Sequence, residues 1–169
     1  MTDELPESAE RAFEYHDAFT RDGDGFLVET TVFDGRVTAV DGPEYLSAYT
    51  VTVEVPTLDA ATADDVGDAV AAGWFDTLQR RLEDAPQATR ADVDLETFDV
   101  ERDGEEIYVT FAFEWGNADR AVEIAKAFVE YVEGTYVEGV IPGYEYESPV
   151  DQLIDSASQD GGGGGGTPL

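Results

Sequence analysis

Two stretches of alternating apolar and polar residues constrain the fold of this chain more than any other feature of its sequence. Successive side chains of a β-strand point to opposite faces, so each stretch predicts a strand with one buried face and one solvent-exposed face. Each stretch is followed by a segment whose apolar residues have helical spacing. The sequence therefore predicts helices packed against a sheet. The buried phase comprises Tyr49, Val51, Val53 and Val55 in the first stretch, and Ile107, Val109, Phe111, Phe113 and Trp115 in the second.

The rest of the chain supplies further helices and strands. The dipeptides Asp34-Gly35 and Asp103-Gly104 predict tight turns between strands. The element order α-βββ-α-ββ-α predicts an α+β fold with a mainly antiparallel sheet and with the helices packed on one of its faces. The predicted segments are helices over about residues 6–19, 64–83 and 118–133, a short helix over about 150–157, and strands over about 26–33, 36–40, 45–55, 93–101 and 105–115.

The length of 169 residues fits one domain and a short tail. We expect a single α+β domain over residues 1–158 and a flexible tail over residues 159–169, which contains six consecutive glycines. The lysine and hydroxyl residue of a phosphate-binding loop do not follow these glycines. The chain has no cysteine, which excludes disulfides, thiolate metal ligands and cysteine catalysis.

Acidic residues dominate the charge of the chain. Asp and Glu number 39 against 9 Lys and Arg, which gives a net charge of −30. Surface carboxylates at this density repel one another in dilute buffer. In about 1 M salt the Debye length falls to about 3 Å, and most of this repulsion is screened. We therefore expect a folded, halophilic archaeal protein of a salt-rich cytoplasm. The charge argues against nucleic acid and anionic membranes as partners, and no apolar run is long enough to cross a membrane.

Two resemblances add to this interpretation. The element order over about residues 6–134 resembles the type III secretion chaperone-like fold, which implies a small, acidic, often dimeric protein that binds other proteins. The chain also resembles an uncharacterised family of small haloarchaeal acidic proteins. That resemblance is carried by residues 133–144, EGTYVEGVIPGY, and it implies no activity.

Two features that suggest catalysis or metal binding have a simpler interpretation. The segment Asp22-Gly23-Asp24-Gly25 has the spacing of an EF-hand loop, but Thr31 occupies the position of the bidentate glutamate. We interpret the segment as an acidic turn. His16, the only histidine, shares a helix face with apolar residues, and we interpret it as structural. The sequence therefore predicts no catalytic residue, no cofactor and no specific metal.

A surplus of aromatic residues is the feature that we connect with function. Neighbouring residues of a helix point about 100° apart, so adjacent Trp74 and Phe75 cannot both face one core centre: either this helix is buried broadly or Phe75 contacts a partner. Aromatic side chains with a polar group are favoured at interfaces. We predict a non-enzymatic protein-interaction or chaperone-like binding module, which forms a homodimer or binds a protein partner. The alternative is a small-ligand-binding protein or a simple hydrolase with a pocket near the C-terminal tyrosines. The expected interaction surface comprises Trp74, Phe75, Trp115, Tyr131, Tyr136, Tyr144 and Tyr146.

Overall fold

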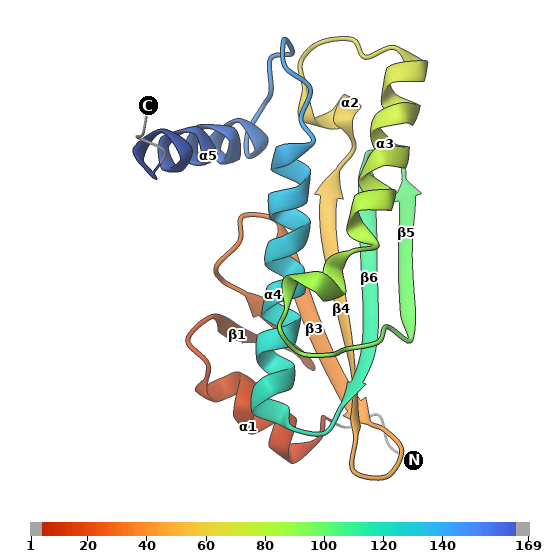
Figure 1. Ribbon diagram of the computed structural model, residues 1–169, viewed down its shortest axis with the longest axis vertical. Helices are drawn as coiled ribbons and strands as arrows, with labels where there is room; N and C mark the ends of the chain where they lie inside the picture. The colour runs from red at the N-terminus through yellow and green to blue at the C-terminus, as the bar shows by residue number, and fades with distance from the viewer. Residues whose placement is uncertain (1–4, 165–169) are drawn as a thin grey trace.

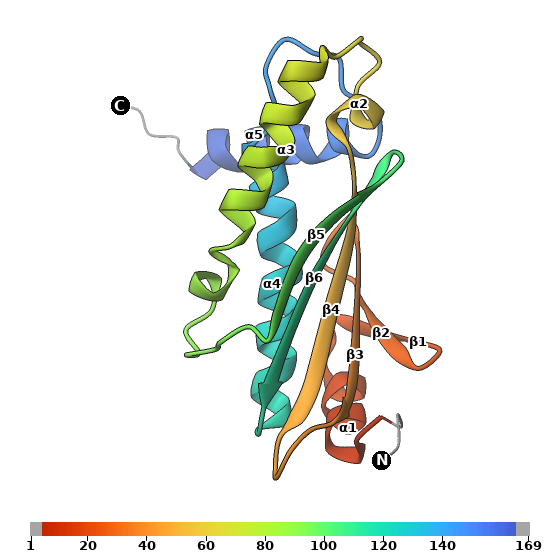
Figure 2. The same ribbon diagram turned by 90° about the vertical axis from the view of Figure 1, so that its right-hand side faces the viewer.

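One open antiparallel sheet of six strands carries the helices on one side. The computed structural model describes residues 5–164, and the side chains of residues 5–157. The strand order across the sheet is β1-β2-β3-β4-β6-β5, and helices α1, α3 and α4 cover one face (Figures 1 and 2). The predicted α+β class is confirmed, and the predicted element order agrees broadly, with four strands in place of three before α2. The strands are β1 (Phe19–Asp22), β2 (Gly25–Val28), β3 (Asp34–Asp41), β4 (Ser47–Pro56), β5 (Thr97–Asp103) and β6 (Glu106–Trp115); the helices are α1 (Glu7–Tyr15), α2 (Leu58–Ala61), α3 (Asp68–Leu82), the 3-10 helix η1 (Ala85–Ala88), α4 (Ala118–Glu138) and α5 (Val150–Gly164).

The two alternating stretches form the central strand pair of the sheet. In β4 and β6, Val51 lies opposite Phe111 and Val53 lies opposite Val109, and all four side chains are fully buried. Helix α4 lies across this row and packs Phe128 against Phe111, with ring centroids 5.1 Å apart. The alternation predicted both strands because each buries the side chains of one phase only.

The N-terminal region differs from the prediction in one strand. Helix α1 ends at Tyr15 instead of near residue 19, and Phe19 begins a short strand that pairs with β2 through a turn at Asp22–Gly25. Phe19 packs edge-to-face on Phe13 at 5.0 Å, in the same cluster as Phe26. Phe19 therefore reaches the apolar cluster of α1 from a strand and not from a continuation of the helix.

The predicted turn at Asp34-Gly35 is wrong. Both residues lie inside β3, where Gly35 is opposite Val53 of β4. A Cβ atom on Gly35 would come within 2.9 Å of Cγ2 of Val129 in α4, and closer still to Cγ1. Glycine is therefore required at this position by the close approach of α4 to the sheet and not by a turn.

The helices toward the C-terminus also differ in their limits. Helix α3 begins at Asp68 instead of residue 64, and α4 continues past Gly134 to Glu138. The extra turn of α4 buries Tyr136, whose hydroxyl donates to the carbonyl oxygen of Pro56 at 3.0 Å. Helix α5 extends over residues 159–164 of the predicted tail, and residues 165–169 lie outside the described part. Among the described helices, none is both long and apolar enough to span a bilayer.

Candidate functional site

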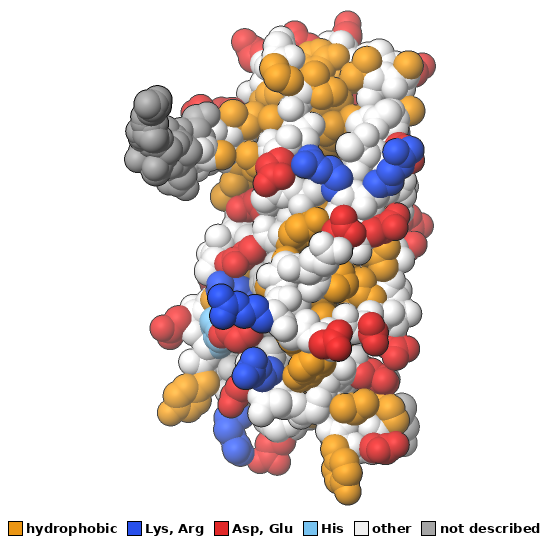
Figure 3. Space-filling model, in the orientation of Figure 1, with side chains coloured by type: hydrophobic (Ala, Val, Ile, Leu, Met, Phe, Trp, Pro, Cys, Tyr) orange, Lys and Arg blue, Asp and Glu red, His pale blue; other side chains and the backbone are white. Residues whose placement is uncertain are grey.

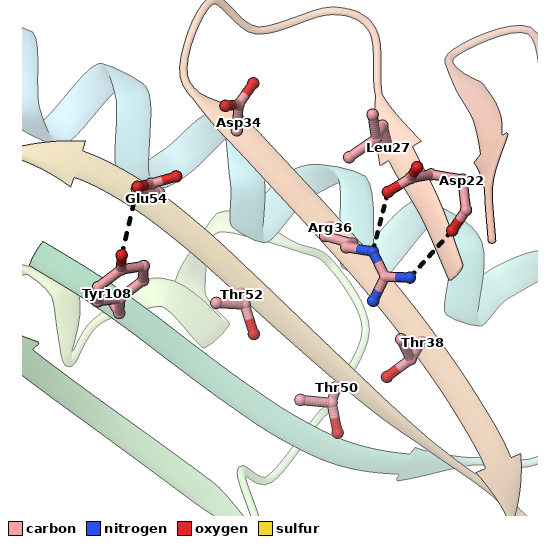
Figure 4. Close-up of a pocket in the computed structure, with 9 residues that line it drawn as sticks. All are labelled: Asp22, Leu27, Asp34, Arg36, Thr38, Thr50, Thr52, Glu54 and Tyr108. Atoms are coloured by element: carbon pink, nitrogen blue, oxygen red, sulfur yellow. Dashed lines mark hydrogen bonds and ion pairs between the residues drawn. The ribbon is translucent and has the colours of Figure 1, made fainter. Parts of the chain in front are cut away.

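The face of the sheet opposite the helices is uncovered and carries a threonine-rich hollow. Thr50 and Thr52 of β4 lie at its centre, opposite Thr38 of β3 and Thr110 of β6 respectively. The hollow has a volume of about 540 Å³, and Leu27 and Tyr108 stand at its two sides (Figure 4). All of these side chains are half-buried. Thr50, Thr52, Tyr108 and Thr110 are solvent-facing residues of the two alternating stretches that predicted β4 and β6.

An arginine held by the β1–β2 turn borders one side of the hollow. The Nε of Arg36 donates to Oδ2 of Asp22 at 3.2 Å, and its Nη2 donates to the Asp22 carbonyl at 2.9 Å and to Oδ1 of Asp24 at 2.6 Å. This guanidinium lowers the pKa of the Asp24 carboxyl. The carboxylates of the predicted acidic turn are therefore engaged by Arg36. Within residues 5–157, no cluster of three or more Asp, Glu or His side chains could hold a metal ion.

The other end of the uncovered face collects negative charge. Asp34 and Glu54 are direct cross-strand neighbours, and like charges in such a pair repel each other. The Tyr108 hydroxyl donates to Oε1 of Glu54 at 3.4 Å, and the charge of Glu54 raises the pKa of Tyr108. Burial, followed by the charge of Glu54, raises the pKa of Glu106. This end of the face therefore favours the binding of a cation or a hydrogen-bond donor.

His16 has both ring nitrogens engaged within the chain. Its Nε2 lies 2.6 Å from Oε2 of Glu123 in α4, and its Nδ1 accepts the backbone N–H of Ala18 at 3.1 Å. The neutral imidazole with its proton on Nε2 satisfies both contacts. His16 therefore fastens the link between α1 and β1 to α4, which is a structural role.

The predicted aromatic set is divided between the core and the helix side of the molecule. Trp74 and Tyr136 are buried and pack edge-to-face at 5.4 Å, whereas the other five residues are half-buried. Tyr144 and Tyr146 pack edge-to-face at 6.5 Å. Trp115 ends β6, opposite Ser47, and makes no contact of this kind with the others.

Three of the tyrosine hydroxyls bond to the backbone. Tyr131 donates to the Arg81 carbonyl at 2.7 Å, and Tyr136 donates to Pro56. The Tyr146 hydroxyl donates to the Ile141 carbonyl at 2.7 Å and accepts the Ile141 N–H at 2.8 Å. These bonds stabilise the chain around the end of α4, where Figure 3 shows hydrophobic side chains gathered over α2, the start of α3 and the α4–α5 link. The interaction surface expected from the sequence stays a prediction.

Sequence reasoning did not find the hollow. The only signal in the sequence was the polar phase of two predicted strands. Thr50 and Thr52 precede Glu54 in the strand over 45–55, and Tyr108 lies in the strand over 105–115. The bonding of Arg36 to Asp22 and Asp24 had no signal in the sequence, because it depends on the pairing of β2 with β3.

Comparison with known proteins identifies a family and no activity. A family model described as "Family of unknown function (DUF5813)" matches residues 14–156. No curated protein and no solved structure matches the chain. The match confirms the expected relation to a family without an assigned activity. The match extends from the end of α1 into α5, so it includes the whole sheet.

Proposed function

We propose that this chain, which belongs to DUF5813, a family of unknown function, is a non-enzymatic protein-interaction module whose binding surface is the uncovered sheet face. The observation that carries this proposal is the hollow of about 540 Å³ that crosses the central strands. Helices seal the other face of the sheet, so the two faces differ in what they can bind (Figure 2).

The shape and lining of the hollow suit an extended polypeptide. Thr50 and Thr52 offer hydroxyls and methyl groups along its floor, and Leu27 and the Tyr108 ring offer apolar surface at its sides (Figure 4). Small-molecule sites usually enclose most of their ligand. The lining side chains here remain half-exposed along the strands, which favours a chain that lies across the sheet over an enclosed small molecule.

The charges of this face indicate the chemistry of the partner. Arg36 is already engaged by two carboxylates, whereas Asp34, Glu54 and Glu106 lie together without a cationic partner among the described ion pairs. An arginine or lysine of a bound segment would relieve their mutual repulsion. The partner is therefore an extended segment that alternates basic residues with β-branched ones.

The setting of this function is part of the same proposal. The net charge of −30 supports a halophilic archaeal source and a salt-rich cytoplasm, where such a coat is screened. The order of a helix, four strands, helices, two strands and helices is broadly the one that suggested a chaperone-like role, in which the module holds a segment of another protein.

Binding of labelled peptides tests the proposal. A fluorescein-labelled peptide alternating valine or threonine with arginine is titrated with the protein, and a matched peptide carries glutamate in place of arginine. The arginine peptide should bind, and Thr52→Arg, which fills the hollow with a cation, should weaken its binding about tenfold, a cost of about 1.4 kcal/mol. Gln87→Arg makes a charge-matched change at an exposed position of η1 and should leave binding unchanged. Equal binding of both peptides, or equal affinities of the two variants, would refute the proposal.

A further inference from the structure

Strand β5 is an edge of the sheet whose outer side has no neighbouring strand within residues 5–164. In the strand order β1-β2-β3-β4-β6-β5 it pairs with β6 alone. Figure 2 looks onto this edge, and no described helix lies in front of β5 in that view. The opposite edge strand, β1, has four residues, whereas β5 has seven, and none of the seven is buried. Strand β5 is therefore the longer open edge, and such an edge offers free backbone groups to another strand.

The turn between β5 and β6 decides which backbone groups point outward. It contains two residues, with Asp103 paired to Glu106 across it. The residues that flank such a turn bond to each other, and bonded pairs alternate along an antiparallel ladder. The residues of β5 in the phase of Asp103 therefore direct their N–H and C=O groups toward β6. The other phase directs these groups to the open edge, and it comprises Phe98, Val100 and Arg102.

The two phases of β5 also present different side chains. Asp99, Glu101 and Asp103 lie on the uncovered face of the sheet and are exposed. None of the three takes part in an ion pair with another described residue. On the helix side, Phe98 stacks on a buried ring of β6 with centroids 5.6 Å apart, yet Phe98 and Val100 are only half-buried. An added strand would therefore meet carboxylates on one face and apolar surface on the other.

The acidic row disfavours a second copy of this chain as the added strand. A symmetric pair of β5 strands needs a two-fold axis perpendicular to the sheet, so residues at equal distances from the axis lie opposite each other. An axis at Val100 places Asp99 opposite Glu101, and an axis at Asp99 or at Glu101 places that residue opposite itself. Like charges directly opposite each other destabilise a strand pair. The edge therefore selects against its own copy and favours a strand that brings cations.

We infer that β5 binds an extended basic segment of a partner protein, which adds to the sheet as one more antiparallel strand. Every pair of neighbouring strands in the described sheet is antiparallel, and the added strand continues that pattern. Cationic side chains of the segment lie opposite the carboxylates of β5, and the alternate apolar side chains cover Phe98 and Val100. Main-chain hydrogen bonds hold the segment, and the alternate side chains select it.

This inference goes beyond the proposed function and does not depend on the hollow. The hollow centres on Thr50 and Thr52 of β4, and β6 separates that strand from β5. A segment in the hollow is held by side chains on the sheet face, whereas a segment at β5 is held by its backbone at the edge. Since partners of both sites carry cations, the test must show where a bound peptide lies.

Backbone amide exchange, followed by nuclear magnetic resonance, locates the bound segment. In the free protein, the N–H groups of Phe98, Val100 and Arg102 should exchange fast and those of Asp99 and Glu101 slowly, because only the second set bonds to β6. A saturating peptide as long as β5, alternating lysine and valine, should slow the first set at least about tenfold and leave the second set unchanged. A peptide with glutamate in place of lysine should slow neither set.

The outcome separates the edge from the hollow. A lysine peptide that binds without slowing exchange at Phe98, Val100 and Arg102 would overturn the inference, and it would leave the proposed binding in the hollow standing. A lysine peptide that does not bind at all would also overturn the inference.

Two isomeric peptides separate backbone pairing from attraction between charges. In the antiparallel arrangement the valines lie opposite the outward phase of β5, so their N–H groups face β5 and those of the lysines point away. N-methylation of the valines should therefore weaken binding at the edge at least about tenfold, and N-methylation of the lysines should weaken it much less. Equal losses for the two isomers, or the reverse order, would refute the antiparallel strand.

Charge reversal on β5 supplies a matched pair of variants. Glu101→Arg should weaken binding of the lysine peptide, read from the protection of Val100, by about tenfold. Glu83→Arg makes the same change at an exposed position at the end of α3 and should leave that protection unchanged. Equal effects of the two variants would show that the peptide responds to net charge alone, contrary to a site on β5.

Discussion

The contact between Gly35 and Val129 gives the sharpest test of how α4 is seated on the sheet. Gly35 lies in β3, and Val129 of α4 is fully buried against it. In Gly35→Ala the new Cβ would lie 2.9 Å from Cγ2 of Val129 and closer to Cγ1, well inside van der Waals contact. Either α4 moves away from the sheet or the valine leaves its rotamer.

The size of the effect follows from that overlap. Overpacking of a buried site costs about 1–3 kcal/mol, and for a chain of this length each kcal/mol lowers Tm by about 2–4 °C. We therefore expect Gly35→Ala to melt about 2–12 °C below the wild type. Val129→Ala alone loses two buried methyl groups, at about 0.8 kcal/mol for each carbon and more for the cavity.

The double variant separates this explanation from a general intolerance of β3 to substitution. In Gly35→Ala with Val129→Ala, the new methyl group enters the space that the valine vacated. Its destabilisation should fall short of the sum of the two single variants by about 1–2 kcal/mol. Thermal unfolding followed by far-ultraviolet circular dichroism in about 2 M KCl measures all four proteins under screened conditions. Strictly additive losses would refute the packing account of Gly35.

Three further predictions concern buried polarity, pH and salt. Burial raises the pKa of the Tyr49 hydroxyl, and Ser47 opposes that shift. No described group is in hydrogen-bond geometry with this hydroxyl. Tyr49→Phe should therefore leave the free energy of unfolding unchanged or raise it by up to about 1 kcal/mol. A loss of more than this in urea unfolding would contradict it. Burial raises the pKa of Glu106, so as pH rises above its ordinary 4.5 the unfolded chain releases this proton first and the folded state loses stability. Glu106→Gln should therefore raise Tm near neutral pH and not in acid, and an equal rise at both would refute the assignment. Wild-type Tm should climb as KCl rises from about 0.1 to 1 M, since the Debye length shortens from about 10 to 3 Å; a Tm independent of KCl would contradict the role given to the acidic coat.

The parts of the fold that the sequence predicted are those with long, regular patterns. Strands β4 and β6 each alternate over ten residues, and their buried phases meet in register. Strand β1 has four residues, too few for a period to emerge. At Asp34-Gly35, the turn chemistry and the packing requirement for glycine look the same in sequence, because only the position of Val129 distinguishes them.

The candidate site was harder to predict, because its residues come from several strands. Threonine in a strand is favoured for its β-branched side chain, so Thr50 and Thr52 carried no functional signal by themselves. Arg36 was only the first residue of the strand predicted over about 36–40. Its bonds to Asp22 and Asp24 exist only because β2 pairs with β1 on one side and β3 on the other.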